Sequence, residues 1–186
     1  MSMRHAIYFS PADTSALAAF GKAVLGRSNT TARPVDAGST FPDRQRWLTL
    51  TRSPAHYGFH ATLKAPFELQ EDYTVQSLAE HLQQFACRQS RIQLHSLAPR
   101  QMAGFSALTL VRQPAQLRSL AMQIVTEFEP YRRALTEADI ERRMAQPLST
   151  RQLELLRSYG YPYVDDEFRF HMTLSGPIGE QDTDYL

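Results

Sequence analysis

Apolar and polar residues alternate with two different periods along the chain, and each period occurs several times. Helical spacing of apolar residues predicts helices over residues 13–25, 74–90, 137–144 and 149–159, and another that begins at Pro114. Period-two alternation or short apolar runs predict strands over residues 6–9, 59–63, 91–97, 105–111 and 168–175. This mixed order of elements, with a hairpin signal at Pro99 and Gly104, indicates the α+β class with antiparallel sheets.

One long segment follows neither period. Residues 27–56 are polar and contain prolines, so they are predicted to form a long loop around a short element at residues 47–50. Loops of this length in a compact domain are usually functional or mobile.

Two of the predicted strands carry the same motif, 111 positions apart. Residues 59–67 read Phe-His-Ala-Thr-Leu-Lys-Ala-Pro-Phe, and residues 170–178 read Phe-His-Met-Thr-Leu-Ser-Gly-Pro-Ile. A single His-x-Thr motif means little, but five identities in register are not expected by chance. The prolines at the end of each motif are predicted to end both strands at the same point.

The repeated positions include polar residues as well as apolar ones. Alternate residues of a strand project to the same face, so His60, Thr62 and Lys64 are predicted to share one face. His171 and Thr173 are predicted to do the same in the second copy, and the apolar residues between them to face a core. Core packing explains a repeated Phe or Leu, but it does not explain polar residues repeated on the opposite face. The pair of strands therefore indicates a functional site.

Two histidines in equivalent positions suit acid–base chemistry at phosphorus. Imidazole titrates near pH 6.5, so at neutral pH one ring can accept a proton while the other donates one. His60 and His171 are therefore predicted to be the acid–base pair, with either one as the base. Thr62 and Thr173 are predicted to donate hydrogen bonds to phosphate oxygens.

These paired strands resemble those of the 2H phosphoesterase superfamily, which includes LigT-like RNA ligases and cyclic phosphodiesterases. Residues 57–64 and 167–174 are more narrowly similar to the branch associated with bacterial phosphonate-utilisation operons. Residues 4–9 and 159–163 fit the same branch, so the resemblance spans most of the chain.

The resemblance implies a bilobed LigT-like fold, in which two antiparallel sheets flank a central cleft and the helices lie outside. It implies His60 and His171 as catalytic residues and Thr62 and Thr173 as phosphate ligands. The implied activity is that of a hydrolase, a metal-independent phosphodiesterase without a cofactor, acting in phosphonate metabolism. The implied substrate is a small cyclic or linear phosphodiester, such as a nucleotide or a ribosyl phosphate.

Four further residues are weaker candidates for substrate binding. Lys64 and Arg169 lie on the predicted site face and are expected to bind phosphate, although exposed strand cations are as often only solubilising. Tyr161 and Tyr57 are expected to stack on a base or a sugar, although packing in the core or at its rim is the commoner role of tyrosine.

The whole chain, residues 1–186, is predicted to be one bilobed domain with an internal pseudo-repeat. After Pro66 the first copy continues with a helix and two strands, whereas only nine residues follow Pro177. The pseudo-symmetry predicts that a matching helix and hairpin of about 40–50 residues is missing. The chain is therefore expected to be a truncated version of a longer protein.

Charge and cysteine content limit the partners and the compartment. The 20 Lys and Arg residues and 19 Asp and Glu residues leave a net charge of +1, which favours a small phosphodiester over folded RNA as the partner. Cys87 is the only cysteine, so neither an intrachain disulfide nor a cysteine metal cluster is expected. No stretch approaches the ~20 apolar residues that cross a bilayer, and the first nine residues are predicted as a strand rather than a signal peptide. The expected location is the cytoplasm, away from membranes.

Three other functions stay open. His60 and His171 could be ligands of a metal hydrolase, although catalytic zinc normally takes three protein ligands and no His-x-x-x-His spacing occurs. The chain could instead be a phosphate-ligand or RNA-binding module that does not turn over its ligand. The third is an RNA-end ligase or cyclic phosphodiesterase.

Overall fold

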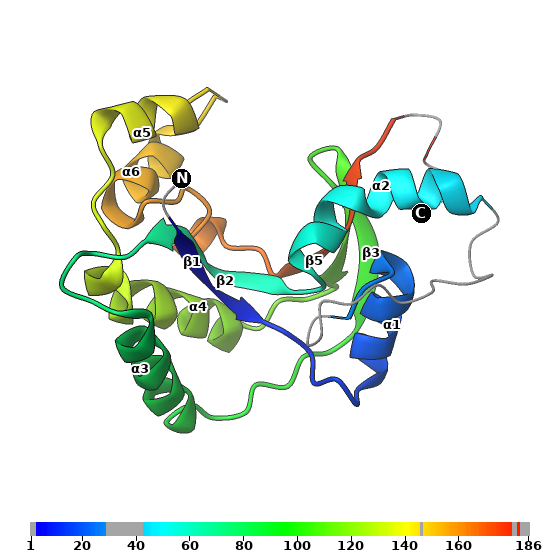
Figure 1. Ribbon diagram of the computed structural model, residues 1–186, viewed down its shortest axis with the longest axis horizontal. Helices are drawn as coiled ribbons and strands as arrows, with labels where there is room; N and C mark the ends of the chain where they lie inside the picture. Colours follow the sequence, from blue (N-terminus) through cyan, green and yellow to red (C-terminus); the bar gives the residue numbers. More distant parts are fainter. Residues whose placement is uncertain (1–2, 29–42, 146, 180–181, 183–186) are drawn as a thin grey trace. The chain divides into compact units, whose positions relative to one another are not determined.

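Six α-helices and five β-strands form the described part of the chain, a computed structural model that covers residues 3–28, 43–145, 147–179 and 182 (Figure 1). The strands are β1 (Arg4–Phe9), β2 (Ala61–Glu68), β3 (Leu97–Met102), β4 (Phe105–Leu110) and β5 (His171–Pro177). The helices are α1 (Ala16–Leu25), α2 (Arg44–Tyr57), α3 (Val75–Cys87), α4 (Ala115–Glu127), α5 (Glu137–Arg143) and α6 (Thr150–Tyr159). Two short 3₁₀ helices are η2 (Glu129–Tyr131) and η3 (Asp165–Glu167). The α+β class predicted from the sequence is confirmed.

The five strands form one sheet in the order β1-β2-β5-β4-β3. β3 and β4 are an antiparallel hairpin whose last pair is Met102 and Phe105. Ala103 and Gly104 between them have φ angles of 44° and 84°, as a two-residue type I′ turn requires. Pro99 is tolerated in β3 because an edge strand leaves one row of backbone groups unpaired. The described residues thus form one sheet where the resemblance implied two.

The chain divides into two compact units that are interleaved in the sequence. Unit 1 comprises Met1–Ile7, Leu63–Leu94 and Gln113–Arg169, and unit 2 comprises Tyr8–Thr62, His95–Arg112 and Phe170–Leu186. Strands β1 and β2 each continue from one unit into the other. The central cleft between two lobes stays a prediction.

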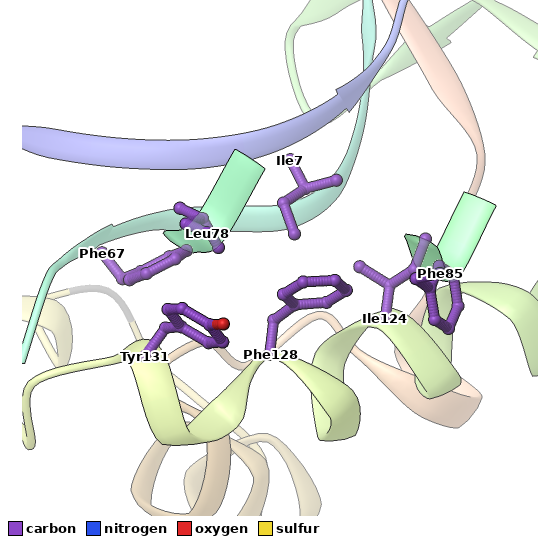
Figure 2. Packing of buried hydrophobic residues seen from close by; sticks show 7 residues of the cluster. All are labelled: Ile7, Phe67, Leu78, Phe85, Ile124, Phe128 and Tyr131. Atoms are coloured by element: carbon purple, nitrogen blue, oxygen red, sulfur yellow. The ribbon is translucent and has the colours of Figure 1, made fainter. Parts of the chain in front are cut away.

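Aromatic and aliphatic side chains form the core of unit 1 (Figure 2). Figure 2 shows Ile7 pointing from β1 toward Phe128 and Ile124. The ring of Phe128 is fully buried, with its centroid 5.7 Å from that of Phe85 on α3. The apolar residues whose helical spacing predicted α3 and α4 therefore form the faces that these helices bury in this core. The complete cluster consists of Ile7, Phe67, Leu78, Phe85, Ile124, Phe128 and Tyr131.

Helices α1 and α2 pack beside the repeated strands in unit 2. The indole N–H of Trp47 on α2 donates to the carbonyl oxygen of Val24 on α1 (2.6 Å). Gly21 of α1 lies against the buried ring of Phe59, and a Cβ added at Gly21 would lie 2.2 Å from that ring. A Cβ added at Gly176 of β5 would lie 3.3 Å from the carbonyl oxygen of Leu50 on α2. These contacts pack α1 against Phe59, the residue before His60, and α2 against β5.

The predicted loop over residues 27–56 is wrong from residue 44 onward, where α2 forms; residues 29–42 lie outside the described part of the chain. Asp43 caps α2 by accepting a hydrogen bond from the amide of Arg46 (2.9 Å). One face of this polar helix is buried, and that packing stabilises it in spite of Pro54 in its last turn. The buried residues of α2 are Trp47, Leu50, Thr51 and Pro54.

Two strand predictions are displaced rather than absent. The first hairpin strand was expected at residues 91–97, and β3 occupies Leu97–Met102 instead. β2 continues through Pro66 to Glu68, so Pro66 does not end its strand as the motif predicted, whereas β5 does end at Pro177.

Candidate functional site

The first residues of the two repeated strands lie side by side in unit 2. Ala61 of β2 pairs with Met172 of β5, and the two strands run antiparallel. Only 1% and 0% of these two side chains is exposed. Phe59 and Phe170, the preceding residues on the same face, are also buried. The apolar face of both motifs is therefore confirmed as the face toward the core.

Four half-buried polar side chains occupy the opposite face. The antiparallel register places His60 opposite Thr173, and His171 opposite Thr62. The two histidines are therefore diagonal neighbours, with Cα atoms about 7–8 Å apart and within reach of long side chains. The repeat thus generates two equivalent histidine–threonine pairs on adjacent strands.

The neighbouring strands extend this polar face. Thr109 of β4 pairs with His171, and Ala107 of β4 pairs with Thr173. On β3, the exposed Arg100 pairs with Ala107, so it projects on the same face as Thr173. Only the small side chain of Ala107 stands between Arg100 and Thr173. The sequence did not single out Arg100. The hairpin register that places Arg100 here begins at the turn formed by Ala103 and Gly104, of which only Gly104 was recognised.

A hydrogen bond orients the ring of His60. Its Nδ1 lies 2.8 Å from the carbonyl oxygen of Gly58, which can only accept a hydrogen bond. Nδ1 therefore carries the proton, and Nε2 keeps its lone pair. Gly58 has φ 80° and ψ 176°, a conformation that glycine adopts far more readily than other residues. Gly58, which ends α2, thus presents its carbonyl group to the imidazole.

Each histidine also has an aromatic neighbour in unit 2. Tyr8 of β1 stacks on His60, with ring centroids 3.8 Å apart and planes inclined by 29°. Phe105 of β4 lies beside His171, with centroids 6.0 Å apart. Neither aromatic residue was singled out from the sequence. The signal for Tyr8 is weak, since it is only one residue of a short apolar run.

Burial is the main cause that lowers the pKa of His60 below its ordinary value of 6.5. The hydrogen bond to Gly58 opposes this shift, and repulsion from His171 adds to it. At neutral pH the His60 ring is therefore uncharged, and its Nε2 can accept a proton. Below pH 6.5 the unfolded chain binds a proton that the folded chain resists, so the free energy of unfolding should fall as the pH drops.

Replacing His171 by glutamine should raise the pKa of His60 toward 6.5, because it removes the repulsion between the two rings. Burial persists in this variant, so part of the lowering should remain. An NMR titration of the imidazole C–H signals measures the shift. His95→Gln, an exposed histidine of unit 2, is the matched control and should leave His60 unchanged. An identical His60 titration in both variants would contradict the placement of the two rings.

Lys64 was predicted to share a face with His60 and Thr62 and to bind phosphate, and this role stays a prediction. Its side chain belongs to unit 1 and is buried, with 3% of the residue exposed. Nζ donates to the carbonyl oxygen of Val125 (3.0 Å) and to the carboxylate of Glu129 (2.9 Å). The carboxylate of Glu129 compensates this buried ammonium group. Burial lowers the pKa of Lys64, and the bond to Glu129 opposes the shift.

The remaining predicted ligands are spread over both units. Arg169, in unit 1, is exposed, and its guanidinium donates to the carbonyl oxygen of Asp166 (2.7 Å). Tyr161, also in unit 1, is half-buried beside Tyr163, with ring centroids 5.4 Å apart. Tyr57 ends α2 in unit 2 and is 64% exposed. Their roles in substrate binding stay predictions.

Within the described ranges, no group of three or more His, Cys, Asp or Glu side chains is arranged to hold a metal ion. None of the helices in this part of the chain combines the length and the apolar character that a membrane crossing needs.

A family described as "Protein of unknown function (DUF1045)" matches residues 62–186, about two thirds of the chain. The chain belongs to the DUF1045 family. The matched segment contains three of the four site residues, Thr62, His171 and Thr173, and it begins two residues after His60. No solved structure matches the chain.

Two curated relatives of this DUF1045 chain have the same name, ribose 1,5-bisphosphate phosphokinase PhnN. The protein of Janthinobacterium sp. (strain Marseille) is 37% identical over 185 residues, which are 98% of this chain and 41% of the relative. The protein of Laribacter hongkongensis (strain HLHK9) is 35% identical over 182 residues, which are 97% of this chain and 42% of the relative. The chain therefore spans about two fifths of the length of the curated relatives it matches.

These names correct the activity expected from the sequence. The resemblance implied a hydrolytic phosphodiesterase, whereas both relatives are named as kinases. A kinase transfers a phosphoryl group to an acceptor other than water, so the expectation of hydrolysis is wrong on this comparison. Membership of the 2H phosphoesterase superfamily stays a prediction from the paired strands.

Proposed function

We propose that this chain binds a ribosyl phosphate on the polar face of β2 and β5, and that His60 and His171 transfer protons during phosphoryl chemistry on it. The proposal is carried by the register of β2 and β5, which places His60 opposite Thr173 and His171 opposite Thr62. Two imidazoles and two hydroxyls on one small face are the groups that a phosphoryl centre requires for proton transfer and charge stabilisation.

The two histidines have different roles in this proposal. His60 acts as the base, because its Nδ1–H donates to Gly58 and its neutral Nε2 can accept a proton from the ligand. As a hydroxyl of the ligand attacks phosphorus and loses its proton to His60, His171 acts as the acid and gives a proton to the oxygen that leaves phosphorus. Thr62 and Thr173 donate hydrogen bonds to phosphate oxygens as negative charge develops on them.

The relatives' name supports the choice of ligand. Ribose 1,5-bisphosphate is a phosphorylated ribosyl compound, and the symbol PhnN in the name supports a place in phosphonate metabolism. The Gly-x-x-x-x-Gly-Lys-Ser/Thr signature that binds nucleotide phosphates does not occur in the 186 residues. The chain is therefore proposed to handle the sugar phosphate rather than the nucleotide.

The proposal includes an architecture. The pseudo-symmetric pairing of β2 and β5 supports membership of the 2H phosphoesterase superfamily. It also supports a single bilobed domain that is built on the internal repeat. Tyr57 is the weaker ligand candidate within unit 2, and Arg100 joins it as a candidate phosphate contact.

Isothermal titration calorimetry with ribose 5-phosphate and ribose 1,5-bisphosphate tests the binding step. Thr62→Val with Thr173→Val keeps the shape of both side chains but removes both hydroxyls, so affinity should fall about ten-fold for each bond lost to a charged phosphate. Thr49→Val, on the exposed side of α2, is the matched control and should bind like the unmodified protein. Equal affinity in all three proteins would refute the proposed site.

A phosphate-binding module without turnover is the second candidate, because the chain spans only part of relatives that are named as enzymes. Phosphorus NMR of the bound ribosyl phosphate, with ATP and Mg²⁺ present, separates the two functions. Conversion of the ligand supports the catalytic proposal, whereas tight binding without any new phosphorus signal supports the binding module.

A further inference from the structure

A cavity of about 450 Å³ lies within unit 1, and none of its lining residues belongs to unit 2. It is built from the ends of several elements: the start of β1, the second half of β2, the segment from η2 into α5, and the end of α6. Its volume is in the range of cavities that hold small ligands. Lys64 and Tyr161, which were singled out from the sequence, both line it.

The lining is strongly basic. Lys64 and Arg132 both pair with Glu129, at 2.9 Å and 2.5 Å. Outside that shared pair, Arg133 contacts Glu68 and Arg142 contacts Asp139, each at 2.5 Å. The cationic residues that line the cavity are Arg4, Lys64, Arg132, Arg133, Arg142 and Arg143. Six cations thus share three carboxylates, which leaves an excess of positive charge around one small space.

The cations are close enough to repel one another. Burial lowers the pKa of Arg143; Asp139 opposes this shift, whereas Arg142, Arg4 and Arg132 reinforce it in that order. Such crowding is unfavourable unless an anion enters the space between the charges. Guanidinium groups suit phosphate oxygens in particular, because their fork of N–H donors binds two oxygens at once.

One wall of the cavity is apolar and fixed. Tyr159 and Tyr161 are packed against the buried cluster of Val125, Leu155 and Val164. A rigid wall of this kind reduces the loss of side-chain conformational entropy that binding would otherwise cause. The basic side and the aromatic side together favour a ligand that has both phosphate groups and a small carbon skeleton.

We propose that this cavity is a binding site for a small molecule with at least two phosphate charges, and that Arg4 and Arg142 contact its phosphates. Every residue that lines the cavity belongs to unit 1, whereas His60 and His171 belong to unit 2. Both arginines are exposed at the cavity and are therefore available to an entering anion.

Calorimetry with inorganic pyrophosphate at low ionic strength tests this site. The double variant Arg4→Gln/Arg142→Gln should weaken pyrophosphate binding about 100-fold, about ten-fold for each charged hydrogen-bonding group removed. Arg118→Gln/Arg157→Gln removes the same charge from exposed positions of unit 1 that do not line the cavity, and it should change affinity less than about three-fold. Thermal unfolding without ligand checks that both double variants are folded.

Two results would overturn the proposal. Equal weakening in both double variants would mean that pyrophosphate responds only to net charge, and no detectable binding to the unmodified protein would mean that the cavity holds no such ligand. The variant His60→Asn/His171→Asn separates the two sites, because it should still bind pyrophosphate. Loss of pyrophosphate binding in that variant alone would assign the ligand to the polar face of β2 and β5 and would remove the second site.

Discussion

Replacing His60 by asparagine should slow conversion of a ribosyl phosphate by about 10²–10⁴-fold, the usual contribution of a general base. The asparagine amide can still donate to the carbonyl oxygen of Gly58, so the side chain should keep its place on the polar face. Affinity for the ligand should change little, because Thr62 and Thr173 are proposed to bind its phosphate. The expected change is therefore in kcat, with KM nearly constant.

The pH dependence provides a second readout for the same variant. In the unmodified protein, kcat should decline as His60 becomes protonated, at a pH below 6.5 because the pKa of this ring is lowered by burial. This acidic limb should be absent from His60→Asn. His95→Asn is the matched control and should retain both the rate and the limb. Full activity in His60→Asn would show that His60 is not the base.

Replacing Gly21 by alanine should lower the free energy of unfolding by about 3 kcal/mol, the upper end of the usual cost of overpacking a core. Alanine favours a helix over glycine by about 1 kcal/mol, so helix propensity alone predicts the opposite sign. The deciding contact is the ring of Phe59, which would lie 2.2 Å from the new Cβ. The melting temperature should fall by roughly 6–12 °C for a chain of this size.

A double-mutant cycle identifies the cause of that loss. Phe59→Ala alone should cost about 3–5 kcal/mol, because this ring is 2% exposed. In the double variant Gly21→Ala/Phe59→Ala the clash is absent, so the combined cost should be smaller than the sum by at least about 1 kcal/mol. Additive costs would mean that the helix, rather than its contact with Phe59, is damaged. Gly21→Ala should also disturb the titration of His60, which follows Phe59 directly.

The repeat was the most informative feature of the sequence. It predicted two strands with a polar and an apolar face, and the burial of Ala61 and Met172 confirms that alternation. The sequence did not predict that the two strands pair directly, or that each histidine faces the threonine of the other copy. Strand periodicity determines which side chains share a face, but it does not determine which strands are neighbours.

Helix α2 shows a signal that was present in the sequence and not recognised. Its buried residues Trp47, Leu50, Thr51 and Pro54 follow the helical spacing of three and four. Polar neighbours and the proline obscured this stripe, since a loop was expected from composition. Packing against α1, which includes the hydrogen bond from Trp47 to Val24, decides the structure of this segment.

The position of Lys64 could not be derived from its own strand. Period-two alternation placed it beside His60 and Thr62, whereas its ammonium group pairs with Glu129, 65 residues later. Arg100 and Tyr8 are similar cases, because each reaches the polar face or His60 only through the order and register of the strands. Contacts of this kind depend on tertiary structure, and no local pattern encodes them.

The interleaving of the two units has a consequence for synthesis on the ribosome. Unit 2 requires Tyr8–Thr62 and also residues from Phe170 onward, so β2 emerges more than 100 residues before β5, one of its two neighbours in the sheet. His60 and His171 cannot meet until that late segment has been translated, whereas α3 and α4 of unit 1 are complete earlier. Pairings between such distant residues form slowly, because closing a long loop costs entropy before any contact is gained. A nascent chain of this protein therefore acquires its histidine pair only after the residues between His60 and His171 have been translated.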